Sequence, residues 1–340
     1  MRVVTGFFIF FLLMIGVDGP LVAMSRLGCL GLGAAEVWVP GLGYGISRQW
    51  DKAIVFGSSR LITSSLAYSS YDTIYYQDDP DQIYQTVDKA NTESGKTETR
   101  VYLNKETWDA NYYSSLNFNL LLISLGDLYQ HSCKPNTETY DLMLSPFRFD
   151  HFYKKWEFWI PIGVLIGNFA YFNEASEKES ETRVRYFLKR GLKESDLRRD
   201  SFPKYYFVGV GEEMFFRGTL QHYFFETMKD SWGVSPAASR HLSIAAASVV
   251  FAAGHDGNGF TADYFWAFMF GIYEGYVYHP SLESFDLMTA IAVHSWWDLL
   301  VTYTILNSAE FTESQAKVKI PLLSIGFRYS KISDHIPYGK

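Results

Sequence analysis

The chain has 340 residues, of which 48% are hydrophobic and 18% aromatic, yet its mean hydropathy is only −0.06. This composition excludes a disordered chain, and Cys29 and Cys133 are too few for a disulfide framework. The net charge of −7 argues against binding to nucleic acid. Polar residues gather in a few stretches, so the rest of the chain fits an α-rich globular protein or a polytopic membrane protein.

The N-terminus carries the features of an export signal. An uncharged apolar run covers residues 3–17 after Arg2, and the small residues Ala23 and Ser25 follow it. We therefore predict that residues 1–25 are a signal peptide or an N-terminal membrane segment. The run is short for a helix that spans a bilayer, which needs about 20 apolar residues.

The next three regions differ in polarity. Residues 26–74 are apolar and rich in Gly and Ser, with a polar break at residues 48–52, and we predict a hairpin of two short helices. Residues 75–109 are acidic and polar, which predicts an insert that stands in water. Residues 110–155 begin with an apolar window and are predicted to form a connecting helix and loop.

A basic segment, residues 174–204, precedes the most apolar part of the chain. Its Val184, Phe187, Leu188 and Leu192 recur at helical spacing, which predicts an amphipathic surface helix. Its many Lys and Arg residues favour a cytoplasmic position by the positive-inside rule.

Apolar helical windows make up most of the C-terminal half, and turn signals separate them. No alternation with a period of two residues occurs in these windows, so we predict an all-α polytopic membrane helical bundle, with short N-terminal apolar helices and a polar insert. Residues 307–340 are predicted to be a C-terminal tail. The windows cover residues 158–173, 205–225, 241–255, 264–278 and 287–306.

Ionisable residues interrupt three of these windows. A charged residue at mid-membrane costs roughly 2.5–3.5 kcal/mol, so such groups must pair or face a wet cavity. Taken singly, a Glu–Arg pair is usually a solvated surface feature and a histidine at a helix end is usually a cap. Together, on three apolar helices, they favour a functional cluster in the core of the bundle. The residues are Glu212, Glu213, Arg217, His255, His294 and Asp298.

The spacing of these residues forms three motifs. Glu213 and Arg217 are four positions apart and can pair along one helix face, whereas Glu212 points about 100° away. With these motifs, residues 156–306 resemble the CPBP family of intramembrane proteases, which includes CAAX prenyl endopeptidases of the Rce type and bacterial relatives linked to bacteriocin processing and immunity. The motifs, in the order of that family, are Glu212-Glu213-x-x-x-Arg217, Phe251-x-x-x-His255 and His294-x-x-x-Asp298.

The resemblance implies a membrane-embedded endopeptidase that hydrolyses a peptide bond. Glu212 would take a proton from the attacking water, and His255 would help to hold that water. His294 would donate a hydrogen bond to the developing oxyanion.

The same resemblance assigns supporting roles to three more residues. Arg217 would hold Glu213 and keep the two adjacent carboxylates from sharing a proton. Asp298 stands where some relatives carry Asn; when ionised it only accepts hydrogen bonds, so it would orient His294 or be protonated.

Cofactor and partners follow from this mechanism. The glutamate–water mechanism requires no ion, but an open zinc site with Glu212, His255 and His294 as ligands is an alternative, although the HExxH spacing is absent. The expected partners are membrane lipid and a peptide or protein substrate. A prenylated CAAX protein is the family precedent for the substrate, and a different target is the alternative for a protein with an export signal. The N-terminal signal favours a multi-pass protein of a bacterial envelope, in the inner membrane.

Two further interpretations belong to other classes. A non-catalytic membrane scaffold or immunity-type protein would use the same polar cluster for helix registry or partner binding. A soluble helical protein with a cleaved export signal would also fit the composition. His222, His241 and His279 sit at polar edges of the windows and receive no role.

Overall fold

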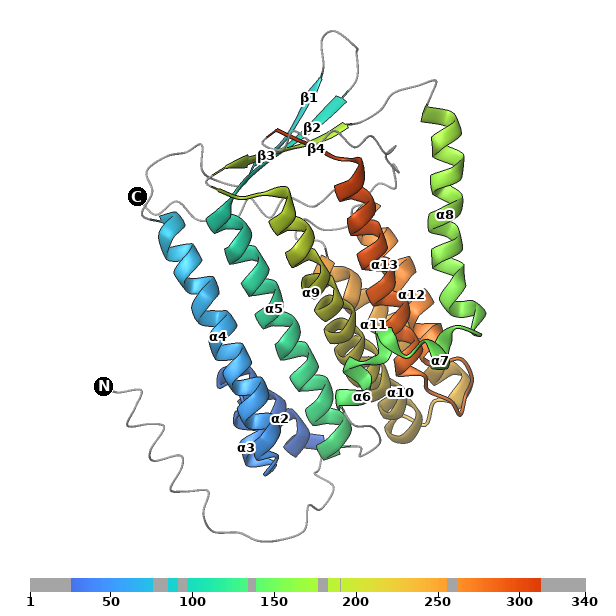
Figure 1. The fold of residues 1–340 in the computed structure, drawn as a ribbon. Coiled ribbons are helices and arrows are strands. Elements are labelled where there is room, and N and C mark those ends of the chain that lie inside the picture. The colour runs from blue at the N-terminus through green and yellow to red at the C-terminus, as the bar shows by residue number, and fades with distance from the viewer. Residues whose placement is uncertain are drawn as a thin grey trace, which may run out of the picture.

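A bundle of helices with a small β-sheet across one end makes up the protein in the computed structural model (Figure 1). The predicted signal segment, residues 1–25, and most of the predicted tail lie outside the described residues. The structure describes residues 26–75, 85–90, 97–133, 139–176, 183–189, 191–255 and 262–312.

Three helices begin the described chain. They are α2 (Arg26–Trp38), α3 (Leu42–Ile46) and α4 (Trp50–Tyr75). The predicted polar break lies between α3 and α4, where Arg48 adopts a positive φ of 61°. The expected hairpin of two short helices was wrong in length, because α4 continues for 26 residues.

The sheet joins four segments that are far apart in the sequence. Strand β1 (Gln85–Ala90) pairs antiparallel with β2 (Thr97–Asn104), and β3 (Arg183–Lys189) runs parallel to β2. The short β4 (Glu310–Phe311) pairs in parallel with β3 at the edge. Two of the strands therefore lie in the insert that the sequence predicted only as polar.

Strand β3 corrects the prediction of an amphipathic helix between residues 174 and 204. Its residues pair with β2 along their whole length, and Leu188 packs with Val101 and Leu103 in a buried cluster. The partner strand lies about 80 positions earlier, so local spacing gave no sign of it. The protein is mostly helical, which confirms the all-α class for the bundle, but the sheet was not predicted.

The middle of the chain contains the long helix α5 and a series of short elements. Asn104 caps α5 by accepting a hydrogen bond from the backbone N–H of Thr107 at 2.7 Å. A disulfide joins Cys29 on α2 to Cys133 at the end of the π-helix η2. The elements are α5 (Lys105–Leu128), η2 (Tyr129–Cys133), α6 (Thr139–Met143), η3 (Ser145–Phe147), α7 (Phe149–Phe152) and α8 (Trp156–Ser176).

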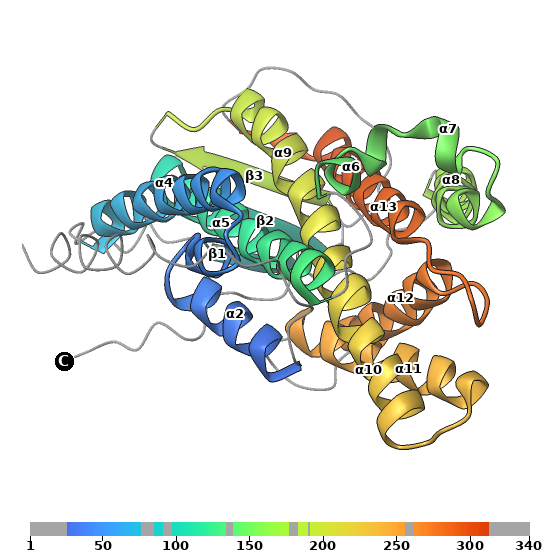
Figure 2. The same ribbon diagram turned by 90° about the horizontal axis from the view of Figure 1, so that it is seen from below.

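The elements between residues 194 and 308 are helical, as the sequence predicted, and α9 lies between α5 and α13 (Figure 2). All five apolar windows lie within helical segments, and two of the windows end at the same residue as their helix. The segments are α9 (Glu194–Glu212), the π-helix η4 (Glu213–Gln221), α10 (His222–Glu226), the π-helix η5 (Thr227–Ser231), α11 (Pro236–His255), α12 (Ala262–Tyr278) and α13 (Leu287–Ser308).

Close approach of helices to α9 fixes the core around the site. A Cβ atom at Gly209 would lie 2.6 Å from the Cα atom of Ser295 on α13. A Cβ atom at Gly211 would lie 2.8 Å from the carbonyl oxygen of Asn119 on α5. Glycine at these positions therefore allows α13 and α5 to contact the α9 backbone directly.

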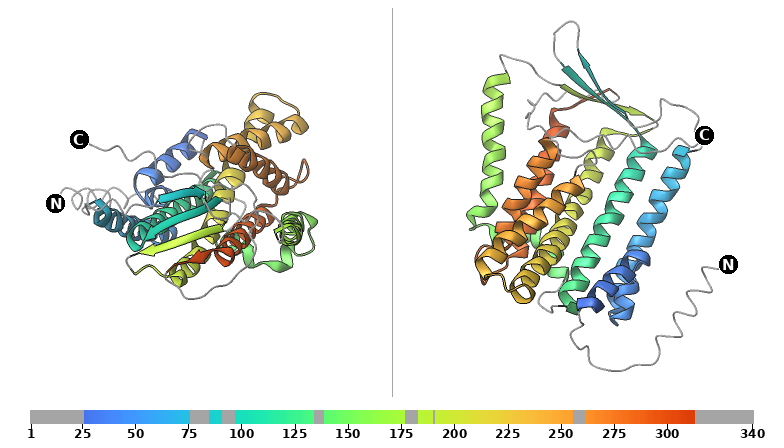
Figure 3. Two further views of the ribbon diagram at one scale, coloured as in Figure 1. Left: turned by 90° about the horizontal axis from the view of Figure 1, so that it is seen from above. Right: turned by 180° about the vertical axis from the view of Figure 1, so that it is seen from behind.

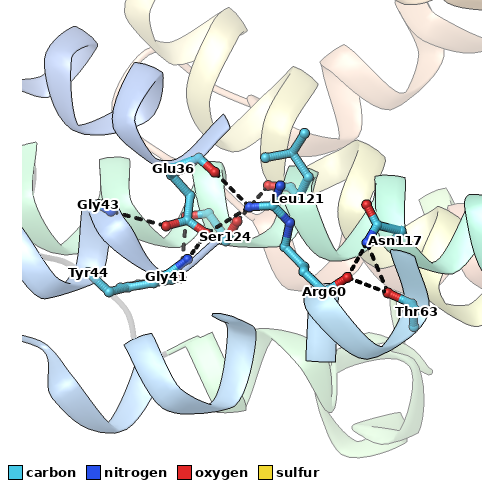
Figure 4. Close-up of polar contacts among 9 residues, drawn as sticks. All are labelled: Glu36, Gly41, Gly43, Tyr44, Arg60, Thr63, Asn117, Leu121 and Ser124. Carbon is cyan, nitrogen blue, oxygen red and sulfur yellow. Dashed lines mark hydrogen bonds and ion pairs between the residues drawn. The ribbon is translucent and has the colours of Figure 1, made fainter. Parts of the chain in front are cut away.

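A buried ion pair ties α2 to α4 (Figure 4). Arg60 donates to a carboxylate oxygen of Glu36 at 2.9 Å and to its carbonyl oxygen at 2.7 Å. The Glu36 carboxylate also accepts from the backbone N–H groups of Gly41 and Gly43 at 3.0 and 3.2 Å. Asn117 on α5 donates to the carbonyl oxygen of Arg60 at 2.6 Å. These contacts link α2, α4 and α5 through one polar cluster.

A second buried pair ties α4 to α5. The Lys52 ammonium lies 3.0 Å from a carboxylate oxygen of Asp127, which also faces His131 at 2.8 Å. Asp127 is fully buried and Lys52 nearly so. The N-terminal region that the sequence predicted as an apolar hairpin is thus attached to the bundle by charge pairs in its interior.

Large apolar side chains cover the outside of the bundle, whose outer helices α4 and α8 lie on opposite sides (Figure 3). By length and hydropathy, α11 is the one helix among the described residues that could cross a membrane, and the apolar part of α8 is shorter. The outward apolar residues include Ile54, Leu61 and Ile62 on α4, Val164 and Ile166 on α8, Val249 and Val250 on α11, and Phe265 and Trp266 on α12.

We predict that Arg60→Met destabilises the protein by about 3–5 kcal/mol, because it leaves the Glu36 carboxylate buried without its cation. The measurement is unfolding in detergent, followed by circular dichroism. The double variant Glu36→Gln/Arg60→Met should recover much of the loss, and Arg48→Met, at an exposed arginine, should have little effect. Equal stability of the wild type and Arg60→Met would contradict the prediction.

Candidate active site

The structure brings the six predicted residues together in the bundle, with His255 and Asp298 on the more exposed side of the cluster. Glu212 is the last residue of α9, and Glu213 and Arg217 lie in η4. His255 is the last residue of α11, and α13 supplies His294 and Asp298. Three helical segments that are separate in the sequence therefore meet at one place.

Glu212 lies at the centre of this cluster. One of its carboxylate oxygens, Oε2, is 3.5 Å from Nε2 of His255 and 3.9 Å from Nε2 of His294. Both separations exceed a direct hydrogen bond. The Glu212 side chain is 13% exposed. The carboxylate thus faces two imidazoles from different helices without being tied to either.

His255 is oriented by its own helix. Its Nδ1 atom is 2.8 Å from the carbonyl oxygen of Phe251, and a carbonyl only accepts, so Nδ1 carries the proton and donates. The Phe251 ring also packs against the imidazole, with centroids 4.3 Å apart. The four-residue spacing of the second motif is what makes both contacts possible. Nε2 is consequently free of the proton in the neutral ring and faces Glu212.

His294 is held by carboxylates on both sides. Its Nδ1 atom donates to Oε1 of Glu213 at 2.7 Å, and its Nε2 atom is 3.6 Å from Oδ2 of Asp298. Only 3% of the side chain is exposed, and the Phe270 ring packs edge-on against the imidazole. Glu213 therefore fixes the ring so that Nε2 points to the same space as Glu212.

Glu213 also pairs with Arg217, as their spacing predicted. The Arg217 Nε atom is 3.3 Å from Oε2 of Glu213, and both side chains have no exposed area. The guanidinium carbon lies 4.9 Å from the centre of the Phe251 ring, which adds a cation–π contact. The sequence did not reveal that Glu213 bridges Arg217 to His294, because His294 lies 81 positions away.

A change of helix type separates the two adjacent carboxylates. The α-helix α9 ends at Glu212 and the π-helix η4 begins at Glu213. π-Helical turns inside longer helices are rare and are frequent at functional sites. Periodicity in the sequence cannot distinguish this geometry from a continuous α-helix, so it was not predicted.

Sequence reasoning missed two buried polar residues near the cluster. Glu274 on α12 and Gln221 at the end of η4 are both fully buried. A signal for Glu274 was present, since it is a carboxylate inside an apolar helical window. Gln221 gave no signal because an amide is common at helix positions of every kind.

The zinc alternative requires at least three ligand side chains that converge on one point. Among the residues that the structure describes, no group of three or more His, Cys, Asp or Glu side chains is arranged to hold a metal ion. The zinc alternative with Glu212, His255 and His294 as ligands stays a prediction.

His222, His241 and His279 have contacts outside the cluster. His241 is exposed and its Nδ1 atom lies 2.8 Å from the hydroxyl of Tyr276. His222 contacts the hydroxyl of Tyr278 at 2.8 Å. His279 was expected at a polar edge, which was wrong, because the ring is fully buried in the connection between α12 and α13. Burial of that ring lowers the pKa of His279 to about 4.

Comparison with known proteins matches part of the chain. Residues 201–300 fit a family model described as type II CAAX prenyl endopeptidase Rce1-like. The matched range includes all six residues of the cluster. No curated protein and no solved structure matches the chain.

The buried ring of His279 predicts a pH-dependent stability. The folded state disfavours the protonated ring, so its contribution to stability is complete above about pH 6.5 and is lost as pH falls toward about 4. The thermal unfolding midpoint in detergent should therefore fall over this range, and it should fall less in His279→Asn. His241→Asn, at an exposed histidine, should keep the wild-type pH dependence. An unchanged slope in His279→Asn would contradict the prediction.

Proposed function

Residues 201–300 belong to the Rce1-like group of the CPBP intramembrane proteases, and from this premise we propose that the protein hydrolyses a peptide bond with a water molecule activated by Glu212. The observation that carries the proposal is the position of the Glu212 carboxylate, 3.5 Å from His255 and 3.9 Å from His294. These separations are too long for direct hydrogen bonds and suit groups that share a small molecule between them.

The first step is attack of water on the scissile carbonyl carbon. The water donates one hydrogen to Glu212 and the other to Nε2 of His255, whose proton is on Nδ1, so a lone pair of the oxygen is directed at the carbonyl. Glu212 takes one proton as the oxygen–carbon bond forms. The carbonyl oxygen becomes an oxyanion, which accepts a hydrogen bond from Nε2–H of His294; the ring is then the imidazolium, with Nδ1–H donating to Glu213 and Nε2–H to the oxyanion.

The second step breaks the peptide bond. Glu212 returns the proton to the nitrogen of the leaving group, the carbon–nitrogen bond breaks, and a carboxylic acid and an amine leave the site. The atoms and protons of one water molecule are thereby divided between the two products.

The other three residues of the cluster keep His294 in place for this role. Glu213 accepts from Nδ1–H of His294, and Arg217 neutralises Glu213 in a region without solvent. Asp298 faces Nε2 of His294 from the partly exposed side of the cluster. The Asp298 carboxylate supports the imidazolium form of His294, which carries a proton on Nε2 and can donate it.

The proposed setting is a membrane that the chain crosses several times. The apolar side chains on the outside of α4, α8, α11 and α12 match lipid, while the charged Arg60 on α4 and Glu274 on α12 are buried. Exposed tryptophans stand at helix ends away from the sheet, including Trp50 at the start of α4 and Trp156 at the start of α8, as in an interfacial belt (Figure 1). The predicted N-terminal signal supports a bacterial inner membrane.

The proposed substrate is a peptide or protein that carries a lipid near the cleaved bond. The name of the matched family supports a prenylated CAAX sequence. A lipid-modified segment would also be held at the membrane surface, where its peptide bond can reach the buried cluster.

Glu212→Gln should lower kcat by about 10²- to 10⁴-fold, because the amide cannot take a proton from water. Cleavage of a prenylated CAAX peptide is measured in detergent or vesicles, together with the unfolding midpoint. The matched control is Glu283→Gln, the same substitution at an exposed residue, which should leave kcat unchanged. Turnover at the wild-type rate by folded Glu212→Gln would rule out the proposal.

The proposed mechanism requires no metal, so cleavage should persist after treatment with a strong zinc chelator. Dialysis against chelator-free buffer and addition of zinc provide the comparison. Loss of turnover with the chelator and its return with zinc would instead support the zinc alternative.

A further inference from the structure

Glu274 is a buried carboxylate that the mechanism above does not use. Its side chain is fully buried, and neither of its carboxylate oxygens has a hydrogen-bond partner among the described residues. Gly271, Gly275 and Tyr278 are also buried, so Glu274 lies on the face of α12 that packs into the bundle. A carboxylate in such a place needs a compensating charge or donor.

The segment opposite Glu274 is η4. The side-chain amide of Gln221 donates to the carbonyl oxygen of Gly275 at 3.0 Å, which places α12 directly against the end of η4 at this level. Arg217 lies one turn earlier in η4. Four ionisable groups act on the Glu274 carboxylate: Glu213 and Asp298 repel a negative charge there, and His294 and Arg217 attract it.

Arg217 has unused donors that match the unused acceptors of Glu274. Its Nε atom faces Glu213, but none of its three nitrogens makes a hydrogen bond within the described part of the chain. A guanidinium has five N–H donors, and one carboxylate cannot satisfy them. Each buried polar group left unpaired destabilises the folded state. A bridging water, or a rotation of either side chain, would satisfy both residues at once.

We propose that Glu274 is a positioning residue of the protease, the second carboxylate that holds Arg217. Arg217 is then fixed between Glu274 and Glu213, and Glu213 fixes His294 through its 2.7 Å hydrogen bond. Without Glu274, the guanidinium turns toward Glu213 and draws that carboxylate away from Nδ1 of His294. The effect on catalysis rests on the proposed function, whereas the pairing of Glu274 with Arg217 does not.

Kinetics test the catalytic part. Glu274→Gln keeps the shape of the side chain and removes its charge, and it should lower kcat per folded molecule by about tenfold or more, as loss of a partner that orients a catalytic residue does. The Michaelis constant should stay unchanged, because Glu274 does not touch the substrate. Glu274→Asp, which keeps the charge, should retain more of kcat than Glu274→Gln. Glu283→Gln is again the matched control.

Thermal unfolding tests the pairing independently of catalysis. In the presence of Arg217, Glu274→Gln should lower the unfolding midpoint, since an attraction is lost. In the Arg217→Met background, the same substitution should raise the midpoint, since it removes a buried carboxylate that has no cation. If Glu274→Gln does not accumulate in folded form, Glu274→Asp and Glu274→Met are compared instead, each with Arg217 and with Arg217→Met.

The outcomes separate this inference from the proposed function. Three outcomes would overturn the inference. They are a wild-type kcat in Glu274→Gln, a change in its Michaelis constant alone, and a midpoint shift that is the same with and without Arg217. Absence of cleavage by the wild type together with the reversed midpoint shift would leave the pairing in place and refute the protease. Normal cleavage by the wild type with no coupling between Glu274 and Arg217 would refute only the pairing.

Discussion

The buried ion pair between Glu213 and Arg217 is the interaction on which the rest of the site depends. Both side chains lie without solvent in an apolar bundle, where either charge alone would cost several kcal/mol. The pair brings a carboxylate to Nδ1 of His294, and that contact in turn directs Nε2 of His294 toward Glu212. A single compensated charge pair therefore determines the orientation of a group on another helix.

Direct contact between helix backbones places the Glu213–Arg217 pair close to the neighbouring helices on which it acts. Gly209 and Gly211 let α13 and α5 approach α9 so closely that any larger residue would clash. The site is consequently built on rigid, directly packed helices rather than on loops. The change from α- to π-helix occurs between the two neighbouring carboxylates. Glu213 pairs with Arg217, and Glu212 faces the two imidazoles.

Buried ion pairs occur in both the N-terminal and the C-terminal helices. In the N-terminal helices, Glu36 pairs with Arg60 and Lys52 pairs with Asp127, all of them buried, while the outer surface of α4 is apolar. In the C-terminal helices, Glu213, Arg217 and His294 are likewise buried. A mean hydropathy near zero in a chain with an apolar exterior is explained partly by these internal pairs and partly by the polar segments that form the sheet.

The sequence by itself determined the helical windows of the C-terminal half and the six residues of the cluster. Helix periodicity and charge inside apolar segments are local properties, so they can be seen without a structure. Only the tertiary structure decided the sheet, because β3 owes its conformation to β2 rather than to its own spacing. It also decided that Glu213 holds His294 and that His279 and Glu274 are buried, because each of these depends on which helices are in contact and at what level along their length.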